Sequence, residues 1–197
     1  MPSKKIPLEY QAILEWVGDG STVLDLGCGD GDLLSLLTHA KQVKGQGIEI
    51  DEQAIYQCVA KGLSVFHEDI DNGLSEYGDN SFDYVILLQS FQQVKKPDVV
   101  LKEALRVGGE VIIGFPNFAH YRARFQMFFQ GKTPVTVSLP YEWHDTPNLH
   151  FLSISDFMEY CQKRAVMIKK SFFLNGDKRI KLWPNLLAET GIFLVAV

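Results

Sequence analysis

A run of glycines near the N-terminus is the part of the chain best suited to hold a ligand. Gly27, Gly29 and Gly31 alternate with other residues directly after 22–26, a short apolar run rich in strand-forming residues. A glycine loop between a strand and a helix presents backbone N–H groups at the carboxyl edge of a sheet. Several protein classes bind nucleotide-like ligands in this way, so the spacing alone does not name the ligand.

The charge of this loop narrows the choice of ligand. Residues 23–40 contain no Lys or Arg, whereas they include Asp25, Asp30 and Asp32. Such a loop would repel a pyrophosphate group. It suits a ligand that carries an ammonium and a sulfonium, as S-adenosylmethionine (SAM) does. The dinucleotide fingerprint G-x-G-x-x-G also requires a glycine where this chain has Asp32, although NAD remains the alternative ligand at this point.

Two acidic residues at the ends of later strands fit the same ligand. Glu49 ends a predicted strand at 47–50, where an acid accepts hydrogen bonds from ribose hydroxyls. Asp69 lies at the end of a predicted strand at 64–70, where a carboxylate can accept from the adenine amino group, and Ile70 would lie along the ring. Because the carboxyl ends of successive parallel strands meet at one edge, these groups would line one cleft.

Strand-like and helix-like segments alternate along the first part of the chain. Helices are expected near 10–17, 33–37, 52–61 and 97–105, and strands at 22–26, 47–50, 64–70, 82–88 and 107–115. Alternating strands and helices predict βαβ units and a mainly parallel sheet. Nearly continuous apolar strands predict that helices cover both faces of this sheet. The expected fold class is therefore α/β.

Residues 117–152 break this alternation. They contain three prolines and no clear strand pattern, so we expect an insertion after the fifth strand, over one end of the sheet. A capping box at 153–156 opens a last helix to about residue 164. Two final strands are expected at 165–174 and 191–197. With no internal repeat or linker, a single domain is the simplest organisation of residues 1–197.

The insertion begins with an aromatic stripe. Phe118, Tyr121, Phe125 and Phe128 recur at helical spacing. The simpler interpretation is that this stripe packs on the sheet. The functional alternatives are a lid over an acceptor pocket or a docking face for another protein.

Composition excludes several other classes. Hydrophobic residues make up 46% of the 197 and charged residues 22%, as in a folded globular chain. No apolar run approaches the roughly 20 residues that cross a bilayer, and the first five residues lead into a helical pattern without a signal core. Three scattered cysteines fit a reducing cytoplasm, no His/Cys cluster has metal-ligand spacing, and a net charge of −5 makes nucleic acid an unexpected partner.

Several of these motifs resemble the SAM-binding motifs of class I methyltransferases. The resemblance rests on Asp25-Leu-Gly-Cys-Gly29, Glu49 and Glu68-Asp69. It implies a Rossmann-like fold with a seven-stranded sheet whose last strand is antiparallel, and a site for SAM or S-adenosylhomocysteine. The resemblance assigns Gly27, Gly29 and Gly31 to the methionine moiety, Glu49 to the ribose, Asp69 to the adenine and Gln89 to the reacting end. The other expected cofactor-binding residues are Asp25, Cys28, Ile50 and Ile70.

A narrower resemblance covers the insertion. Residues 115–124 (FPNFAHYRAR), 140–143 (PYEW) and 146–150 (TPNLH) closely resemble the MetW family of methionine biosynthesis proteins. This resemblance implies a SAM-binding protein of methionine biosynthesis that acts with MetX, a homoserine O-acyltransferase. The alternative is a SAM-dependent methyltransferase that acts on a small-molecule acceptor.

A catalytic residue cannot be assigned from the sequence. The chain lacks the Asn/Asp-Pro-Pro-Tyr motif of amino-methylating enzymes, since residues 88–91 read Leu-Gln-Ser-Phe, and it has no His near 92–93. A general base would have to be His120, His144 or His150. SAM binding is thus better supported than methyl transfer.

Overall fold

A computed structural model describes residues 6–197, which form two compact units. The first unit comprises residues 6–88 and 96–112, and the second comprises 89–95 and 113–197. Residues 1–5, on which the expectation of no signal sequence partly rests, lie outside the described part. No helix within residues 6–197 is long and apolar enough to cross a membrane.

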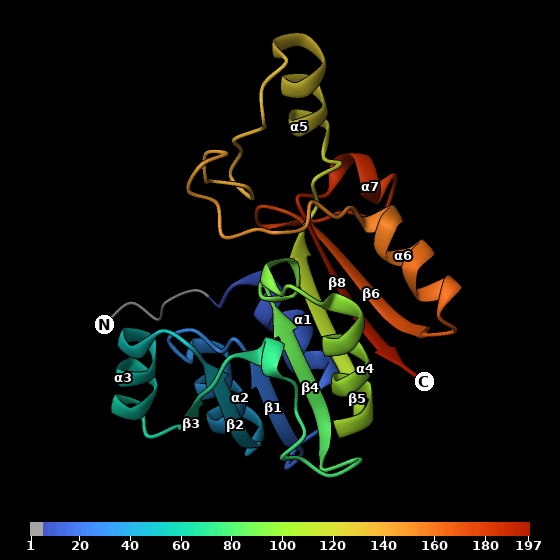
Figure 1. Cartoon of the computed structure of the whole chain (residues 1–197). Coiled ribbons are helices and arrows are strands. Elements are labelled where there is room, and N and C mark those ends of the chain that lie inside the picture. The colour runs from blue at the N-terminus through green and yellow to red at the C-terminus, as the bar shows by residue number, and fades with distance from the viewer. Residues whose placement is uncertain (1–5) are drawn as a thin grey trace. The chain divides into compact units, whose positions relative to one another are not determined.

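The first unit is an alternating α/β unit built on a parallel sheet (Figure 1). Its strands lie in the order β3-β2-β1-β4-β5, and β1 pairs in parallel with both β2 and β4, as β2 does with β3. The elements are α1 (Leu8–Trp16), β1 (Thr22–Leu26), α2 (Asp32–Lys41), β2 (Lys44–Glu49), α3 (Glu52–Ala60), β3 (Ser64–His67), the 3₁₀ turn η1 (Ile70–Asn72), β4 (Phe82–Leu88), α4 (Pro97–Val107) and the first part of β5 (Gly108–Pro116).

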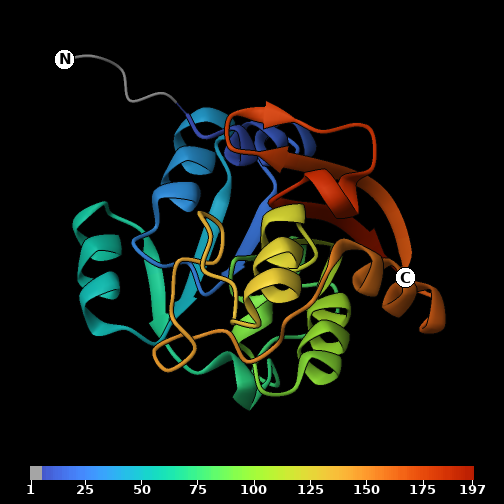
Figure 2. The ribbon, with the colours of Figure 1, turned by 90° about the horizontal axis from the view of Figure 1, so that it is seen from above.

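Local sequence explains why these elements form. The central strands β1 and β4 are nearly all apolar and are buried, and Figure 2 shows α1 and α2 on one face of the unit's sheet and α4 on the other. Asp51 caps α3 by accepting a hydrogen bond from the Ala54 backbone N–H at 2.8 Å. Pro97 occupies the first turn of α4, where its missing N–H is not needed.

The second unit contains an antiparallel arrangement of strands. From Ile113 the end of β5 continues into this unit, where the strand order is β5-β8-β6-β7 and β6 is antiparallel to both β8 and β7. Phe115, Phe157 and Phe193 form its core, with ring centroids 4.8–5.8 Å apart. The remaining elements are the 3₁₀ turn η2 (Phe91–Gln93), α5 (Tyr121–Phe125), the π-helical turn η3 (Gln126–Gln130), α6 (Ile154–Lys163), β6 (Met167–Asn175), β7 (Lys178–Arg179), α7 (Pro184–Leu187) and β8 (Thr190–Ala196).

The fold class is the predicted one, with differences in detail. Eight strands are present among the described residues instead of seven, because Gly176 and Asp177 close a tight hairpin that adds β7. The third strand ends at His67 and not at residue 70, since Asp69 instead caps η1 by accepting from the Asp71 backbone N–H. The expected antiparallel pairing of the last strand is confirmed.

The insertion contains no strand within 117–152, as its prolines indicated. The predicted capping box follows it, with Ser153 and Asp156 satisfying each other's backbone N–H groups at the start of α6. Packing of the aromatic stripe on the sheet is wrong for three of its four members, because Tyr121 is 42% exposed, Phe125 56% and Phe128 83%.

Candidate functional site

The glycine loop turns the chain sharply from β1 into α2. The N–H groups of Gly27 and Cys28 both donate to the Ile48 carbonyl, at 2.8 and 3.1 Å, which ties the start of the loop to β2. Gly29 has a φ of +55°, and a Cβ added there would meet no atom within 4 Å. The backbone of the loop is therefore open to a ligand at Gly29.

Gly31 has a different, structural role. Its φ is +76°, and an added Cβ would lie 2.5 Å from Leu63 Cδ1 and 2.8 Å from Cys58 Sγ. These distances are far below normal contact, so only glycine lets α2 begin here with α3 packed so closely.

Glu49 is the last residue of β2, and its carboxylate is held by backbone donors. It accepts hydrogen bonds from Gly29 at 2.8 Å, from Ile50 at 2.8 Å and from Asp51 at 3.0 Å. A carboxylate has about four acceptor positions. Glu49 is thus oriented toward the glycine loop and has capacity left for a ligand hydroxyl.

Asp25 provides a second acid beside Glu49. It lies in β1 and is only 3% exposed. Burial, and then the neighbouring charge of Glu49, raise the pKa of Asp25 to about 7. Two carboxyl groups in one confined place favour a cationic ligand or a retained proton, and a perturbed acid of this kind is typical of a functional site.

Lys61 changes the charge argument made from the sequence. At the end of α3, its Nζ lies 2.6 Å from Asp32 Oδ1, 2.6 Å from the Asp30 carbonyl and 3.3 Å from Asp30 Oδ2. Partial burial by itself would lower the pKa of Lys61, but hydrogen bonds with Asp32 and Asp30 outweigh it and raise that pKa. Asp30 and Asp32 are therefore paired, and the acids left to attract a cation are Asp25 and Glu49. Sequence reasoning missed Lys61 because it lies 29 residues beyond Asp32.

The side chain of Cys28 has a packing role. Its thiol is buried, 3.9 Å from Cys58 Sγ, and a Cβ on Gly47 would lie 2.5 Å from it. Burial raises the pKa of Cys28 well above the ordinary thiol value, so a reactive thiolate is disfavoured. Only the backbone of Cys28 remains as a contact for a ligand.

Asp69 and Ile70 follow β3 beside the end of β2. The Glu68 N–H donates to the Glu49 carbonyl at 3.1 Å, which joins the two strand ends. Asp69 caps η1, and Ile70 is half-buried in that turn, whereas Ile50 is exposed. The first unit thus brings nine of the ten predicted site residues to one edge of its sheet.

Gln89, the tenth, belongs to the second unit. It has a φ of +63°, and its carbonyl accepts hydrogen bonds from the side-chain amides of Gln92 and Gln93 at 2.8 and 2.9 Å. Within the described residues Gln92 Oε1 is buried without a hydrogen-bond partner. The segment after β4 is thus polar and tightly turned.

The three histidines considered as bases differ in environment. His120 is 1% exposed, and burial lowers its pKa, so it is held neutral. His150 Nε2 lies 2.9 Å from the Val94 carbonyl, and the N–H groups of Leu149 and His150 both donate to the Gln92 carbonyl at 3.0 Å. His150 therefore fixes the insertion to the segment after β4. His144 is exposed beside Glu142.

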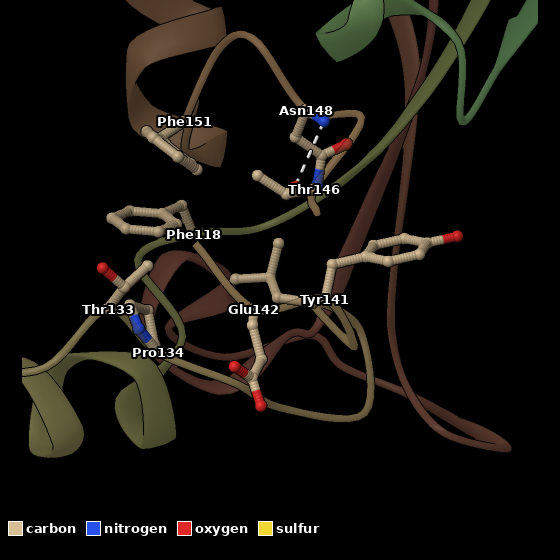
Figure 3. Close-up of a pocket in the computed structure, with 9 residues that line it drawn as sticks. Phe118, Thr133, Pro134, Tyr141, Glu142, Thr146, Asn148 and Phe151 are labelled. Atoms are coloured by element: carbon tan, nitrogen blue, oxygen red, sulfur yellow. Dashed lines mark hydrogen bonds between the residues drawn. The ribbon is translucent and has the colours of Figure 1, made fainter. Parts of the chain in front are cut away.

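A small pocket lies inside the insertion (Figure 3). Figure 3 shows the rings of Phe118 and Phe151 side by side, and their centroids are 4.8 Å apart. Its volume of about 10 Å³ is room for a single water. This pocket is part of the packing of the insertion and is too small for an acceptor substrate.

Comparison with known proteins identifies related sequences along nearly the whole chain. The model of a family described as "Methionine biosynthesis protein MetW" matches residues 8–195. The chain is 33% identical over 198 residues to the bifunctional methionine biosynthesis protein MetXA/MetW of Rhodopirellula baltica, a match covering 94% of this chain and 32% of that protein. It is 30% identical over 129 residues to the demethylmenaquinone methyltransferase of Oceanobacillus iheyensis, covering 59% of this chain and 54% of that one. The chain thus spans 32% of the length of the first of these relatives and 54% of the second.

Solved structures share the fold at lower sequence identity. A SAM-dependent methyltransferase from Archaeoglobus fulgidus has a TM-score of 0.72 at 13% identity, covering 95% of this chain and 90% of that one. A SAM-dependent methyltransferase from Aquifex aeolicus has a TM-score of 0.65 at 16% identity, covering 99% and 93%. The fold is that of the class I methyltransferases.

Proposed function

The chain belongs to the MetW family of methionine biosynthesis proteins, and we propose that it binds SAM at the glycine loop of its first unit and acts with a homoserine O-acyltransferase. The observation that carries the ligand assignment is the pair of acids at this loop. Asp25 is buried, Glu49 is fixed by three backbone N–H groups, and the other two acids of the loop are paired with Lys61. A ligand with a positive charge and ribose hydroxyls satisfies both acids, whereas a pyrophosphate satisfies neither.

Each predicted residue has a defined part in this proposal. The backbone of Gly27, Cys28, Gly29 and Gly31 would surround the methionine moiety, with Asp25 behind it. Glu49 would accept from the ribose hydroxyls through its remaining acceptor position, and Ile50 would pack on the sugar. Asp69 would accept from the adenine amino group, and Ile70 would lie along the ring. Gln89 is proposed to lie at the reacting end of the ligand.

Calorimetry tests the ligand assignment. We expect micromolar binding of SAM or S-adenosylhomocysteine, about −8 kcal/mol, and no comparable binding of NAD. Glu49→Gln and Asp69→Asn each remove a charged acceptor for a ligand donor and should weaken SAM by roughly 1.5–3 kcal/mol. Glu68→Gln, at the exposed neighbour of Asp69, should have little effect. Tight NAD binding, or full SAM affinity in both site variants, would show the assignment to be wrong.

The partner assignment is supported by the printed name of the Rhodopirellula protein, which joins MetXA and MetW in one bifunctional chain. We propose that a separate homoserine O-acyltransferase is the corresponding partner of this chain. SAM is formed downstream of methionine, so a SAM-binding subunit would report the supply of end product to an early enzyme. Such regulation requires SAM to favour one state of the complex over another.

The second candidate function is methyl transfer to a small molecule. It is favoured by the match to a demethylmenaquinone methyltransferase and by the fold. SAM, when bound, supplies an activated methyl group, and an acceptor would need a nearby base unless it is already nucleophilic. His120 is buried and His150 is hydrogen-bonded to Val94, so His144 is the exposed candidate among the three. A methyl-transfer screen on methionine-pathway metabolites, with His144→Ala beside the parent, tests this function. Turnover that exceeds the background hydrolysis of SAM would support it.

A further inference from the structure

Seven aromatic side chains of the insertion are exposed to solvent, and we refer to five of them together as the aromatic surface. Phe128 is the most exposed of them at 83%, and Trp143 follows at 74%. In the second unit, α5 and η3 stand away from β6 and β8 and carry most of this surface (Figure 1). Its members are Tyr121, Phe125, Phe128, Phe129 and Trp143.

So much exposed aromatic area is unusual for a chain that functions alone. An aromatic side chain contributes roughly 150–250 Å² when it is buried, so burial of these five would remove several hundred Å² of apolar surface from water. Exposed apolar patches of that size mark interaction sites. The rings contact one another: the centroids of Phe129 lie 4.5 Å from Phe125 and 4.8 Å from Phe128. These three phenylalanine rings form one continuous patch, and Trp143 lines a cavity together with Met127 of η3.

An open cavity lies beside these rings. Its volume is about 640 Å³, and Phe118, Met127, Trp143 and Phe151 provide its apolar walls, with Lys132 at the same cavity. Interfaces gain most of their binding energy from apolar or aromatic anchors that fill such pockets. This cavity is therefore suited to receive an anchor side chain from a partner.

The charge around the aromatic surface differs between its two parts, because α5, η3 and the loop up to residue 141 carry only cations, whereas Trp143 lies beside the exposed acids Glu142 and Asp145. Residues 116–141 contain Arg122, Arg124 and Lys132 and no acidic residue, although the whole chain has a net charge of −5. Arg122 lies 3.6 Å from the buried Glu189, and Arg122, Arg124 and Lys132 are all exposed. A complementary partner face is apolar at its centre and carries carboxylates at its rim.

We propose that the aromatic surface is the docking face for the homoserine O-acyltransferase, an inference that rests on the proposed function. In the Rhodopirellula relative, the region matching this chain is 32% of a protein whose name includes MetXA. The two proteins named there share one chain, so the MetW-like part is always beside its MetXA partner. Where two such proteins are separate chains, their association requires a surface of its own. The aromatic surface, with its anchor cavity and the cations of α5 and of residue 132, supplies such a surface.

The experiment measures binding of the purified full chain to the purified homoserine O-acyltransferase of the same organism by calorimetry. Trp143→Ala and Phe128→Ala should each weaken the complex at least about tenfold. Trp183→Ala and Leu182→Ala are matched controls, because Trp183 is 75% exposed and Leu182 is 76% exposed in the same unit, and neither lines the cavity. Both controls should bind within about twofold of the parent. SAM affinity, measured on every variant, should stay unchanged because these substitutions leave the glycine loop intact.

The outcomes distinguish a failure of the proposed docking surface from a failure of the proposed function. If the parent binds and the two aromatic variants bind equally well, the docking face is wrong while the partnership stands. If the parent neither binds the acyltransferase nor alters its activity, the proposed partnership fails, and the surface proposal fails with it. Light scattering on the chain alone tests whether a second copy of the chain binds at the aromatic surface instead. A dimer that Phe128→Ala dissociates would assign the surface to self-association and overturn the proposal.

Discussion

Asp25 is a carboxyl group held almost without solvent beside a second carboxylate. Its pKa of about 7, against an ordinary value near 4, means that the folded chain binds a proton there which the unfolded chain releases at moderate pH. The stability that this proton provides is fully present below about pH 4. This stability falls as the pH rises from about 4 to about 7, because the unfolded chain releases the proton in this range while the folded chain keeps it. Above about pH 7 Asp25 ionises in the folded chain as well, and the contribution is gone.

Asp25→Asn should remove this pH dependence. Between pH 4.5 and pH 8 the parent should lose up to about 4 kcal/mol of unfolding free energy relative to the variant. Urea unfolding at several pH values measures this difference. Asp19→Asn, at an exposed carboxylate paired with Lys41, controls for the loss of an acid. Parallel stability profiles for the parent and Asp25→Asn would mean that Asp25 is ionised in the fold at all these pH values.

At the scale of elements, sequence patterns predicted those parts that local rules determine. Apolar runs predicted β1 and β4, and side-chain chemistry predicted the cap of α6. The two-residue strand β7 is too short for a periodic pattern, and its one signal was the turn pair Gly176-Asp177. Helical spacing revealed the stripe at Phe125 and Phe128, but periodicity does not say whether a sheet, solvent or another protein covers a face.

The site was predictable to a similar extent. Strand-end acids such as Glu49 follow from the βαβ pattern, whereas the pairing of Lys61 with Asp32 depends on how α3 packs against the glycine loop. The burial of the Cys28 side chain against Gly47 is likewise a consequence of tertiary packing.

The start of α2 offers a sharp test at this scale. Gly31→Ala combines a left-handed backbone with a Cβ 2.5 Å from Leu63, so it should destabilise the fold by about 2–4 kcal/mol. Gly62→Ala has the same backbone sign, with a φ of +74°, but open space around the new Cβ, and should cost only about 1 kcal/mol. Thermal unfolding of the two variants compares them directly. Equal losses of stability in the two variants would mean that Leu63 and Cys58 move to accommodate the added methyl group.

At the scale of the whole molecule, the chain separates its two proposed tasks. The glycine loop proposed to bind SAM lies in the first unit, and the aromatic surface lies in the second. The single domain expected over residues 1–197 stays a prediction, since two compact units can still unfold as one. A regulatory role requires that ligand binding at one unit changes the free energy of binding at the other.

Reciprocity makes that requirement measurable. If saturating SAM changes the affinity for the acyltransferase by some factor, saturating acyltransferase must change the affinity for SAM by the same factor, typically 5–150-fold. Calorimetry of each ligand with and without the other provides all four constants. A SAM affinity that is identical with and without the acyltransferase would show that SAM binding and acyltransferase binding are not coupled.

The short strands at the ends of the strand order have a further consequence for behaviour in concentrated solution. β3 has four residues, and β7 consists only of Lys178 and Arg179. Unpaired backbone at the rim of a sheet invites strands of other molecules to add on and begin aggregation. A brief strand offers little template, and two adjacent cations repel an incoming copy of themselves. The rim at β3 is thus a poor nucleus for fibril growth. At the other rim β7 pairs only with Leu174 and Asn175, so along the rest of the nine-residue β6 the charges of Lys169 and Lys170 oppose the addition of another strand.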